Sequence, residues 1–151
     1  MIFEHVGLTV SDLEKSIDFY TRVFGFKVLR KTTVNAYLHL DNDLLELMQS
    51  EAPGEVEAPR TPDEWIKLMK GPVGLNHIGF RVDDMDAAVD RIIELGGELA
   101  VPPMEFEPAI QYVSEPGDDK LRRAARPTTK QFWRIATFRD PDGIMLELVE
   151  R

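Results

Sequence analysis

Two histidines stand at equivalent places in a chain that repeats part of its own sequence. The segment Glu4–Leu13 aligns without a gap with Asn76–Met85, and this alignment places His5 opposite His77. Apolar, glycine and aspartate positions also match in the same alignment. Internal repeats of this kind indicate a doubled structural unit, so the two imidazoles are predicted to occupy symmetry-related positions.

Two glutamates are paired in the same way by a second match near the end of each repeat. Asp41–Leu47 resembles Asp142–Leu148, which places Glu46 opposite Glu147. Alternate side chains of a strand share a face, so each glutamate is predicted to share its face with apolar neighbours. A carboxylate in such surroundings needs a compensating partner, because burying an isolated charge is costly.

Together the four side chains offer two imidazole nitrogens and two carboxylates to one shared site. A single histidine in a strand is usually structural, and a single glutamate usually faces solvent, but here both types recur at equivalent points. Such a nitrogen and oxygen set suits a divalent first-row cation: zinc, nickel, cobalt, manganese or ferrous iron. We therefore expect one divalent metal ion bound by His5, Glu46, His77 and Glu147.

The elements that must position these residues follow the same repeat. The first half, residues 1–50, is predicted to form a strand, a helix and three strands, near 2–10, 12–25, 26–31, 34–40 and 44–50. Ser11 or Asp12 is a suitable N-cap for this helix, and Gly25 suits its end. The second half, residues 75–151, repeats the order near 75–82, 84–95, 98–101, 132–139 and 144–150.

A proline-rich and acidic linker, residues 51–74, is predicted to join the halves and to carry a short helix that begins after Thr61. Each half is thus a β-α-β-β-β module, and one module cannot cover both faces of its own sheet. The predicted fold class is α+β: one domain whose two modules have mixed sheets that curl into an open barrel around the shared site. The modules can pair within one chain or across a dimer.

Several motifs, which cover most of the chain outside residues 51–70 and 102–130, carry a family resemblance: His5–Val10, Ile17–Tyr20, Phe24–Phe26, His77–Phe80, Val82–Asp84, Asp140–Gly143 and Leu146–Leu148. In these motifs the chain resembles the vicinal oxygen chelate superfamily. That superfamily includes glyoxalase I, methylmalonyl-CoA epimerase, extradiol dioxygenases, and the fosfomycin and bleomycin resistance proteins. The pattern is most similar to glyoxalase I and to the epimerase, and by position it implies the same four metal ligands.

The resemblance also implies a reaction class. A divalent cation that binds two adjacent substrate oxygens can stabilise an enediolate, while a carboxylate moves the proton beside the carbonyl. We expect Glu147 to be the catalytic base, with Glu46 as the alternative, so the leading interpretation is a metal-dependent isomerase or lyase. The other candidates are an extradiol-type dioxygenase, whose metal usually has fewer protein ligands, and a resistance or ligand-binding protein, which has no need of all four.

A basic segment predicts that the substrate is anionic. The stretch Lys120–Arg134 holds six lysines and arginines and no acidic residue. We expect it to form a lid whose arginines hold an anion, although a solvated surface loop would have the same composition. Arg81 shares strand parity with His77 and is predicted to point into the cavity. The predicted substrate-binding residues are Arg81, Arg122, Arg123, Arg126 and Trp133.

Composition limits the partners and the location of the protein. The 151 residues carry a net charge of −9, which argues against nucleic-acid binding, and there is no cysteine for disulfides or thiolate metal sites. No apolar run is long enough to span a membrane, and Met1 leads into a strand-like segment without a signal core. We expect a cytoplasmic protein that binds a small-molecule substrate, no nucleic acid and no membrane. The resemblance implies a homodimer.

Overall fold

The computed structural model describes residues 3–54, 56–57, 59–71, 73–107 and 132–151. The first half forms β1 (His5–Val10), α1 (Leu13–Phe24), β2 (Lys27–Lys31), β3 (Asn35–Leu40) and β4 (Asp43–Gln49). The linker carries α2 (Pro62–Met69). The second half forms β5 (Ile78–Val82), α3 (Met85–Glu94), β6 (Glu98–Phe106), β7 (Trp133–Arg139) and β8 (Met145–Glu150). The predicted α+β class and the order of elements are confirmed.

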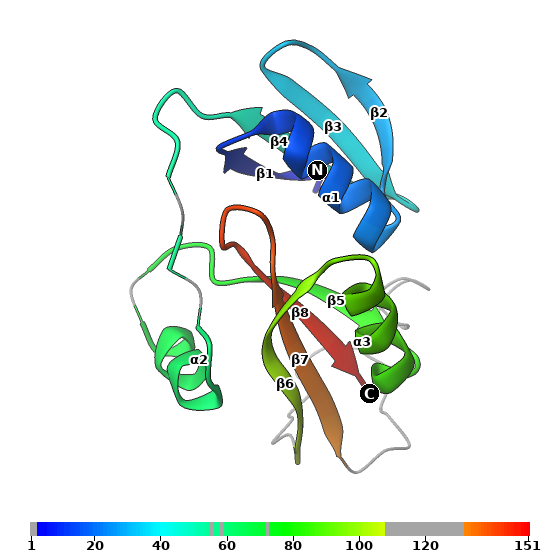
Figure 1. Ribbon diagram of the computed structural model, residues 1–151, viewed down its shortest axis with the longest axis vertical. Coiled ribbons are helices and arrows are strands. Elements are labelled where there is room, and N and C mark those ends of the chain that lie inside the picture. Colours follow the sequence, from blue (N-terminus) through cyan, green and yellow to red (C-terminus); the bar gives the residue numbers. More distant parts are fainter. Residues whose placement is uncertain (1–2, 55, 58, 72, 108–131) are drawn as a thin grey trace.

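The strands form two separate four-stranded sheets with the same topology. The first sheet has the order β1-β4-β3-β2 and the second has the order β5-β8-β7-β6. In each, the first strand runs parallel to the last, and the remaining pairs are antiparallel. Because the two sheets remain separate within one chain (Figure 1), the open barrel stays a prediction.

One strand is longer than its sequence predicts. We predict a strand near residues 98–101, but β6 continues through Pro102 and Pro103 to Phe106. Proline cannot donate a ladder hydrogen bond, and its pairing with β7 shifts register between Val101 and Met104. Irregular pairing at the two prolines therefore allows the strand to continue beyond them.

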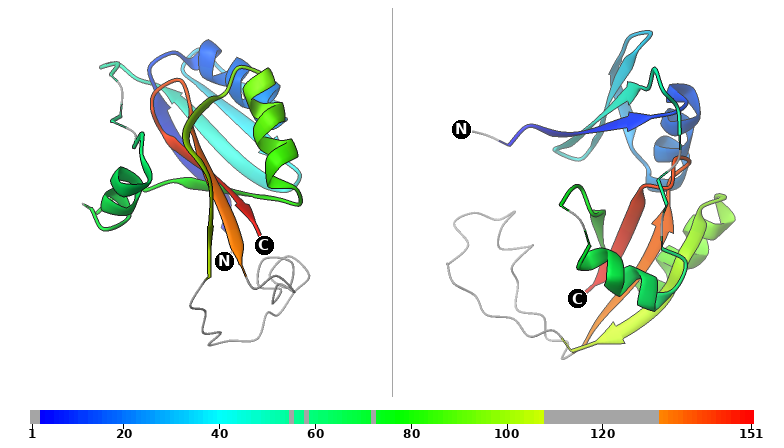
Figure 2. Two further views of the ribbon diagram at one scale, coloured as in Figure 1. Left: turned by 60° about the horizontal axis from the view of Figure 1, so that its bottom comes forward. Right: turned by 90° about the vertical axis from the view of Figure 1, so that its left-hand side faces the viewer.

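Each helix begins at a side-chain cap, as the sequence predicts for α1 and α2. Asp12 accepts from the backbone of Lys15 at 3.0 Å, and Asp84 accepts from that of Ala87 at 3.0 Å. Gly25 ends α1 in the left-handed conformation, with φ of 75°. The right-hand view of Figure 2 shows α1 and α3 on the same side of their sheets.

The two halves share one hydrophobic core. It includes Leu8, Leu47 and Tyr20 of the first half and Met85 and Leu148 of the second. The Phe24 and Phe80 rings, whose centroids lie 4.6 Å apart, link α1 to β5. No helix among the described residues is long and apolar enough to cross a membrane.

A buried polar contact reinforces this junction. The Tyr20 hydroxyl of α1 donates to Oδ2 of Asp140, in the turn between β7 and β8, at 2.9 Å. The other oxygen of Asp140 accepts from the backbone N–H groups of Asp142 and Ile144. The linker joins the same turn, because the Val56 amide donates to the Asp142 carbonyl at 2.7 Å.

Candidate functional site

The first predicted pair lies on the face of the first sheet that points away from α1. Leu45 and Leu47 are buried in the core, so the alternation of β4 turns Glu46 to the opposite face. His5 begins the neighbouring parallel strand, and its Nε2 lies 3.4 Å from Oε2 of Glu46. Only 13% of the Glu46 side chain is exposed.

The second pair repeats this geometry in the second sheet. Leu146 and Leu148 point into the core, and Glu147 between them faces the other side. Nε2 of His77 lies 3.6 Å from Oε1 of Glu147, whose side chain is 12% exposed. Each glutamate is directly opposite a glycine of the parallel strand, Gly7 and Gly79.

Both histidines are oriented through the nitrogen that faces away from the glutamate. Nδ1 of His5 lies 3.0 Å from a Glu4 carboxylate oxygen, and Nδ1 of His77 lies 2.8 Å from the Asn76 side-chain oxygen. In each histidine, a proton on Nδ1 can be donated to the neighbouring side-chain oxygen, and the lone pair of Nε2 is then available for a metal ion. The donor set and its orientation therefore fit a divalent cation.

The two carboxylates have different surroundings. Oε1 of Glu46 accepts from the Asn35 side-chain amide at 2.9 Å. For Glu147, burial raises the pKa above its ordinary value, and the nearby His77 partly opposes this rise. Thr137 is opposite Glu147 in the antiparallel ladder, but its buried hydroxyl makes no hydrogen bond.

The structure brings the four predicted ligands together in two pairs rather than in one cluster. Within the described part of the chain, no three histidine, aspartate or glutamate side chains form a group that could hold a metal ion. Each sheet thus carries one half of the predicted ligand set. The four-ligand site stays a prediction.

The predicted substrate-binding residues fall into two groups. Arg122, Arg123 and Arg126 lie outside the described residues. Arg81 follows Gly79 by two residues on the same strand face, and it donates to the carbonyl oxygen of Arg151 at 3.0 Å. The guanidinium of Arg151 lies 4.8 Å from the centre of the Trp133 ring.

Arg134 belongs to the predicted basic segment but has a structural partner. Its guanidinium makes a two-fold contact with Asp86 of α3, at 2.6 and 2.9 Å, and lies 3.4 Å from Glu150. Hydrogen bonding to Asp86 raises the pKa of Arg134 and lowers that of Asp86. Arg134 therefore ties β7 and β8 to α3.

Sequence reasoning missed a group of residues beside the first pair. The Tyr37 ring meets the His5 ring edge-on, with centroids 5.3 Å apart. The Arg30 guanidinium lies over the same ring, 3.9 Å from the ring centre. Neither residue belongs to the repeat, so the doubled pattern holds no signal for them. The signal that could have found them is cross-strand pairing. Tyr37 is opposite Glu46 and Arg30 is opposite Tyr37, so all three side chains lie on the same face of the sheet.

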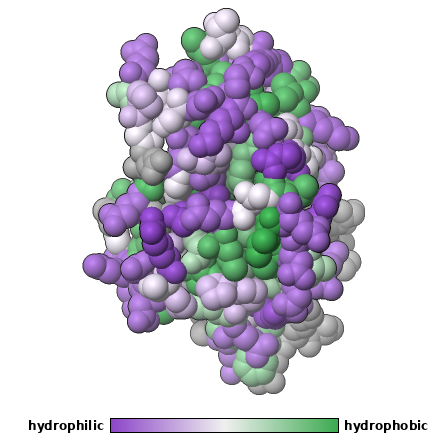
Figure 3. All heavy atoms as spheres, in the orientation of Figure 1, coloured by the Kyte–Doolittle hydropathy of each residue, from purple (hydrophilic) through white to green (hydrophobic). Residues whose placement is uncertain are grey.

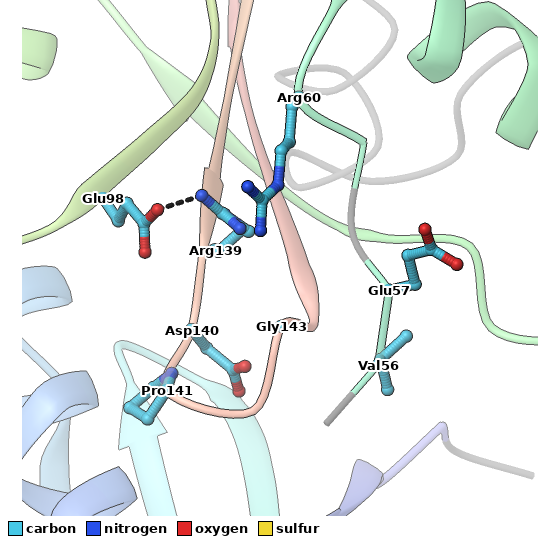
Figure 4. A pocket seen from close by; sticks show the side chains of 8 residues that line it. All are labelled: Val56, Glu57, Arg60, Glu98, Arg139, Asp140, Pro141 and Gly143. Carbon is cyan, nitrogen blue, oxygen red and sulfur yellow. Dashed lines mark hydrogen bonds and ion pairs between the residues drawn. The ribbon is translucent and has the colours of Figure 1, made fainter. Parts of the chain in front are cut away.

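The pocket in Figure 4 is separate from both histidine–glutamate pairs. It encloses about 390 Å³ between the linker and the β7–β8 turn, and none of the four predicted ligands lines it. Arg60 and Arg139 reach toward one another there, and Glu98 neutralises Arg139 by an ion pair. In the orientation of Figure 3, apolar residues form a patch framed by polar ones in the middle of this face.

Comparison with known proteins agrees with the fold. The family model of the Glyoxalase/Bleomycin resistance protein/Dioxygenase superfamily matches residues 2–148, and the chain belongs to this superfamily.

Two relatives and one solved structure show the range of similarity. A probable lactoylglutathione lyase of Vibrio cholerae is 30% identical over 146 residues, which are 97% of this chain and 88% of that protein. A catechol-2,3-dioxygenase of Bacillus subtilis is 30% identical over 127 residues, or 80% of this chain and 41% of that protein. The crystal structure of a glyoxalase family protein from Enterococcus faecalis has a TM-score of 0.66 at 24% identity. The match covers 99% of this chain and 97% of that one.

Proposed function

We propose that this protein is a metal-dependent lyase or isomerase of the glyoxalase type, acting on a small anionic substrate that presents two adjacent oxygens. The observation that carries the proposal is the repeated pair in which a histidine Nε2 faces a half-buried carboxylate. The probable lyase of Vibrio cholerae, similar over nearly the whole chain, supports the reaction class.

The residues divide the work of a proton transfer between them. A bound divalent cation supplies electrophilic stabilisation to substrate oxygens. His5 and His77 hold it through Nε2, because their Nδ1 atoms are engaged elsewhere. Glu147 removes the proton beside the carbonyl and returns it to the neighbouring carbon. Its burial favours this role, since a carboxylate with a raised pKa is a stronger base.

A homodimer is the assembly that completes the site. We propose that residues 1–50 and 75–151 act as two modules, each supplying half of the ligand set. His5 and Glu46 of one protomer then meet His77 and Glu147 of the partner subunit across a two-fold axis. The separation of the two sheets within one chain supports this arrangement.

Replacing the proposed base tests the function. Glu147→Gln preserves size and a ligand oxygen, so the variant should still bind metal. It should lose turnover by about 100-fold or more, the usual contribution of a general base. The measurements are metal content of protein purified without chelator, and turnover on a panel of hemithioacetals, acyl-CoA epimers and catechols. Glu51→Gln, in the exposed linker, is the matched control.

A normal rate for Glu147→Gln would contradict the assignment of Glu147 as the base, and Glu46→Gln would then be the variant to test.

The similarity to the Bacillus subtilis dioxygenase makes the catechols of the substrate panel a test of a second function. Oxygen consumption with a catechol and ferrous iron would favour ring cleavage. That reaction needs one glutamate to stay off the metal, since extradiol-type sites use two histidines and one carboxylate.

A further inference from the structure

We propose that Asn35 is a positioning residue that fixes Glu46, so that the two symmetry-related glutamates have different roles. This inference rests on the proposed function. It begins from the hydrogen bond between the Asn35 side-chain amide and Oε1 of Glu46, which measures 2.9 Å. The other oxygen, Oε2, is left facing His5.

A neighbouring hydroxyl determines which way the Asn35 amide points. Oγ1 of Thr32 donates to the Asn35 side-chain oxygen at 2.6 Å, and it accepts from the Asn35 backbone N–H at 3.0 Å. The side-chain oxygen is therefore occupied, and the side-chain nitrogen must face Glu46. Asn35 is held from both ends, at the point where β3 begins.

Among the described residues, no side chain of the second sheet gives Glu147 an equivalent hydrogen bond. In the first sheet Asn35 is opposite Met48, two residues after Glu46; in the second, Ile135 is opposite Val149, two residues after Glu147. Ile135 therefore occupies the equivalent position, and its side chain cannot donate a hydrogen bond. Among the described residues, His77 is the polar side chain that contacts Glu147.

This difference separates a fixed carboxylate from a movable one. Glu46 is held at Oε1 by Asn35, which leaves Oε2 facing His5, and it is suited to remain a ligand throughout the reaction. Glu147 accepts no hydrogen bond from the described residues of its own sheet, since the Thr137 hydroxyl opposite it makes none, and it can change position while it carries a proton. Neighbours that orient a metal ligand contribute strongly to metal affinity, because they fix the ligand before the ion arrives.

Two substitutions test this role through the affinity for Co²⁺, measured by competition with a chelating dye. Asn35→Ile copies the second sheet into the first and should weaken Co²⁺ binding about 10- to 100-fold. Thr32→Val removes the orienting hydroxyl and should shift affinity in the same direction by less. Thr32→Ser keeps the hydroxyl and is the matched control, with affinity near that of the wild type. Unfolding temperatures of all variants establish that they fold.

A double-mutant cycle distinguishes positioning from a general loss of structure. In a Glu46→Gln background, Asn35→Ile should change Co²⁺ affinity by less than about twofold, because the carboxylate that Asn35 serves is gone. In a Glu147→Gln background the full effect should remain. Equal effects in both backgrounds, or none in the wild type, would overturn the role of Asn35 alone. An affinity for Co²⁺ that is unchanged by both His5→Ala and His77→Ala would overturn the proposed function as well.

Discussion

Arg30 is a charged side chain beside the first histidine–glutamate pair with no acidic partner among the described residues. Its guanidinium lies over Tyr37, whose ring in turn meets His5. Stacking on an aromatic ring restrains the guanidinium and leaves its edge N–H groups available for a carboxylate or phosphate. Arg30 is therefore suited to hold the anionic part of the proposed substrate.

Arg30→Met is expected to raise KM about tenfold at low salt and to leave kcat within about twofold. The cation acts on substrate binding and not on the reacting carbons. The effect should shrink as salt rises, since exposed charges are screened over about 8–10 Å at physiological ionic strength. Steady-state kinetics at two salt concentrations measure both.

Arg22→Met is the control for this experiment, because Arg22 lies on α1 and pairs with Asp18. An unchanged KM for Arg30→Met at low salt would contradict the assignment. Loss of Arg122, Arg123 and Arg126 together is the competing test, since these residues were predicted to hold the same anion.

Four candidate site residues could be proposed from the sequence because they occur twice. Repetition at matched positions is a signal that a single sequence contains. Asn35 and Arg30 occur once, and the position equivalent to Asn35 is Ile135. Their roles depend on cross-strand register, which hydrophobic periodicity does not specify to the residue.

The strands of this fold serve two purposes, one on each face. In β4, Glu46 faces the site, while Gln49 accepts from the Leu13 amide at the start of α1 at 2.9 Å. In β8, Glu147 faces the site, while Glu150 accepts from the Met85 amide at the start of α3 at 2.9 Å. The repeat thus includes helix capping by the last strand.

Hydrophobic periodicity predicted these elements well because each has one apolar face. It was wrong about the length of β6, where the strand continues past two prolines with irregular pairing.

The turn between β7 and β8 makes stability depend on pH through Asp140. Burial is the main cause that raises the pKa of Asp140, against opposing hydrogen bonds. A raised folded pKa means that the contribution of this group is fully present below its unfolded pKa, about 3.9, and is lost as pH rises through the folded value.

Asp140→Asn should therefore raise the unfolding temperature at neutral pH, and the gain should vanish near pH 3. The asparagine oxygen can accept from the Asp142 and Ile144 amides, and its nitrogen can donate to the Tyr20 oxygen. Thermal unfolding across this pH range gives the comparison. Asp90→Asn, at an exposed position of α3, should show no such trend. A variant less stable than the wild type at every pH would mean that the ionised carboxylate is needed at the junction.

At the scale of the molecule, the separation of the two pairs is the feature that sequence could not resolve. Hydrophobic periodicity specifies which face of its strand each residue occupies, but it does not specify which two sheets bring their histidine–glutamate pairs together. That choice depends on sheet edges and on the junction built by Phe24, Phe80 and Tyr20. The homodimer therefore stays a prediction with a sharp test.

Mixing two inactive variants should restore activity if the site is shared between protomers. One variant carries His5→Ala with Glu46→Gln, and the other His77→Ala with Glu147→Gln. Random reassociation would leave about a quarter of the sites intact, because half of the dimers are mixed and each holds one complete site. The measurement is turnover after the two proteins have exchanged subunits, with light scattering to confirm dimers.

Each variant alone is the control and should stay inactive. Failure to recover activity in verified mixed dimers would place all four ligands within one chain. A stable mass near 17.2 kDa at micromolar concentration would contradict the dimer itself.

The alternation of faces along β8 also restricts how this chain could change length during its history. Deleting one residue before Glu147 would turn that carboxylate into the core, where Leu146 and Leu148 are buried, and would present a leucine to the site. His77 follows His5 by 72 residues and Glu147 follows Glu46 by 101, so the second copy is longer by 29. Insertions and deletions that survived selection are therefore expected in the connections between strands. Within the strands, the two copies should differ by substitutions alone.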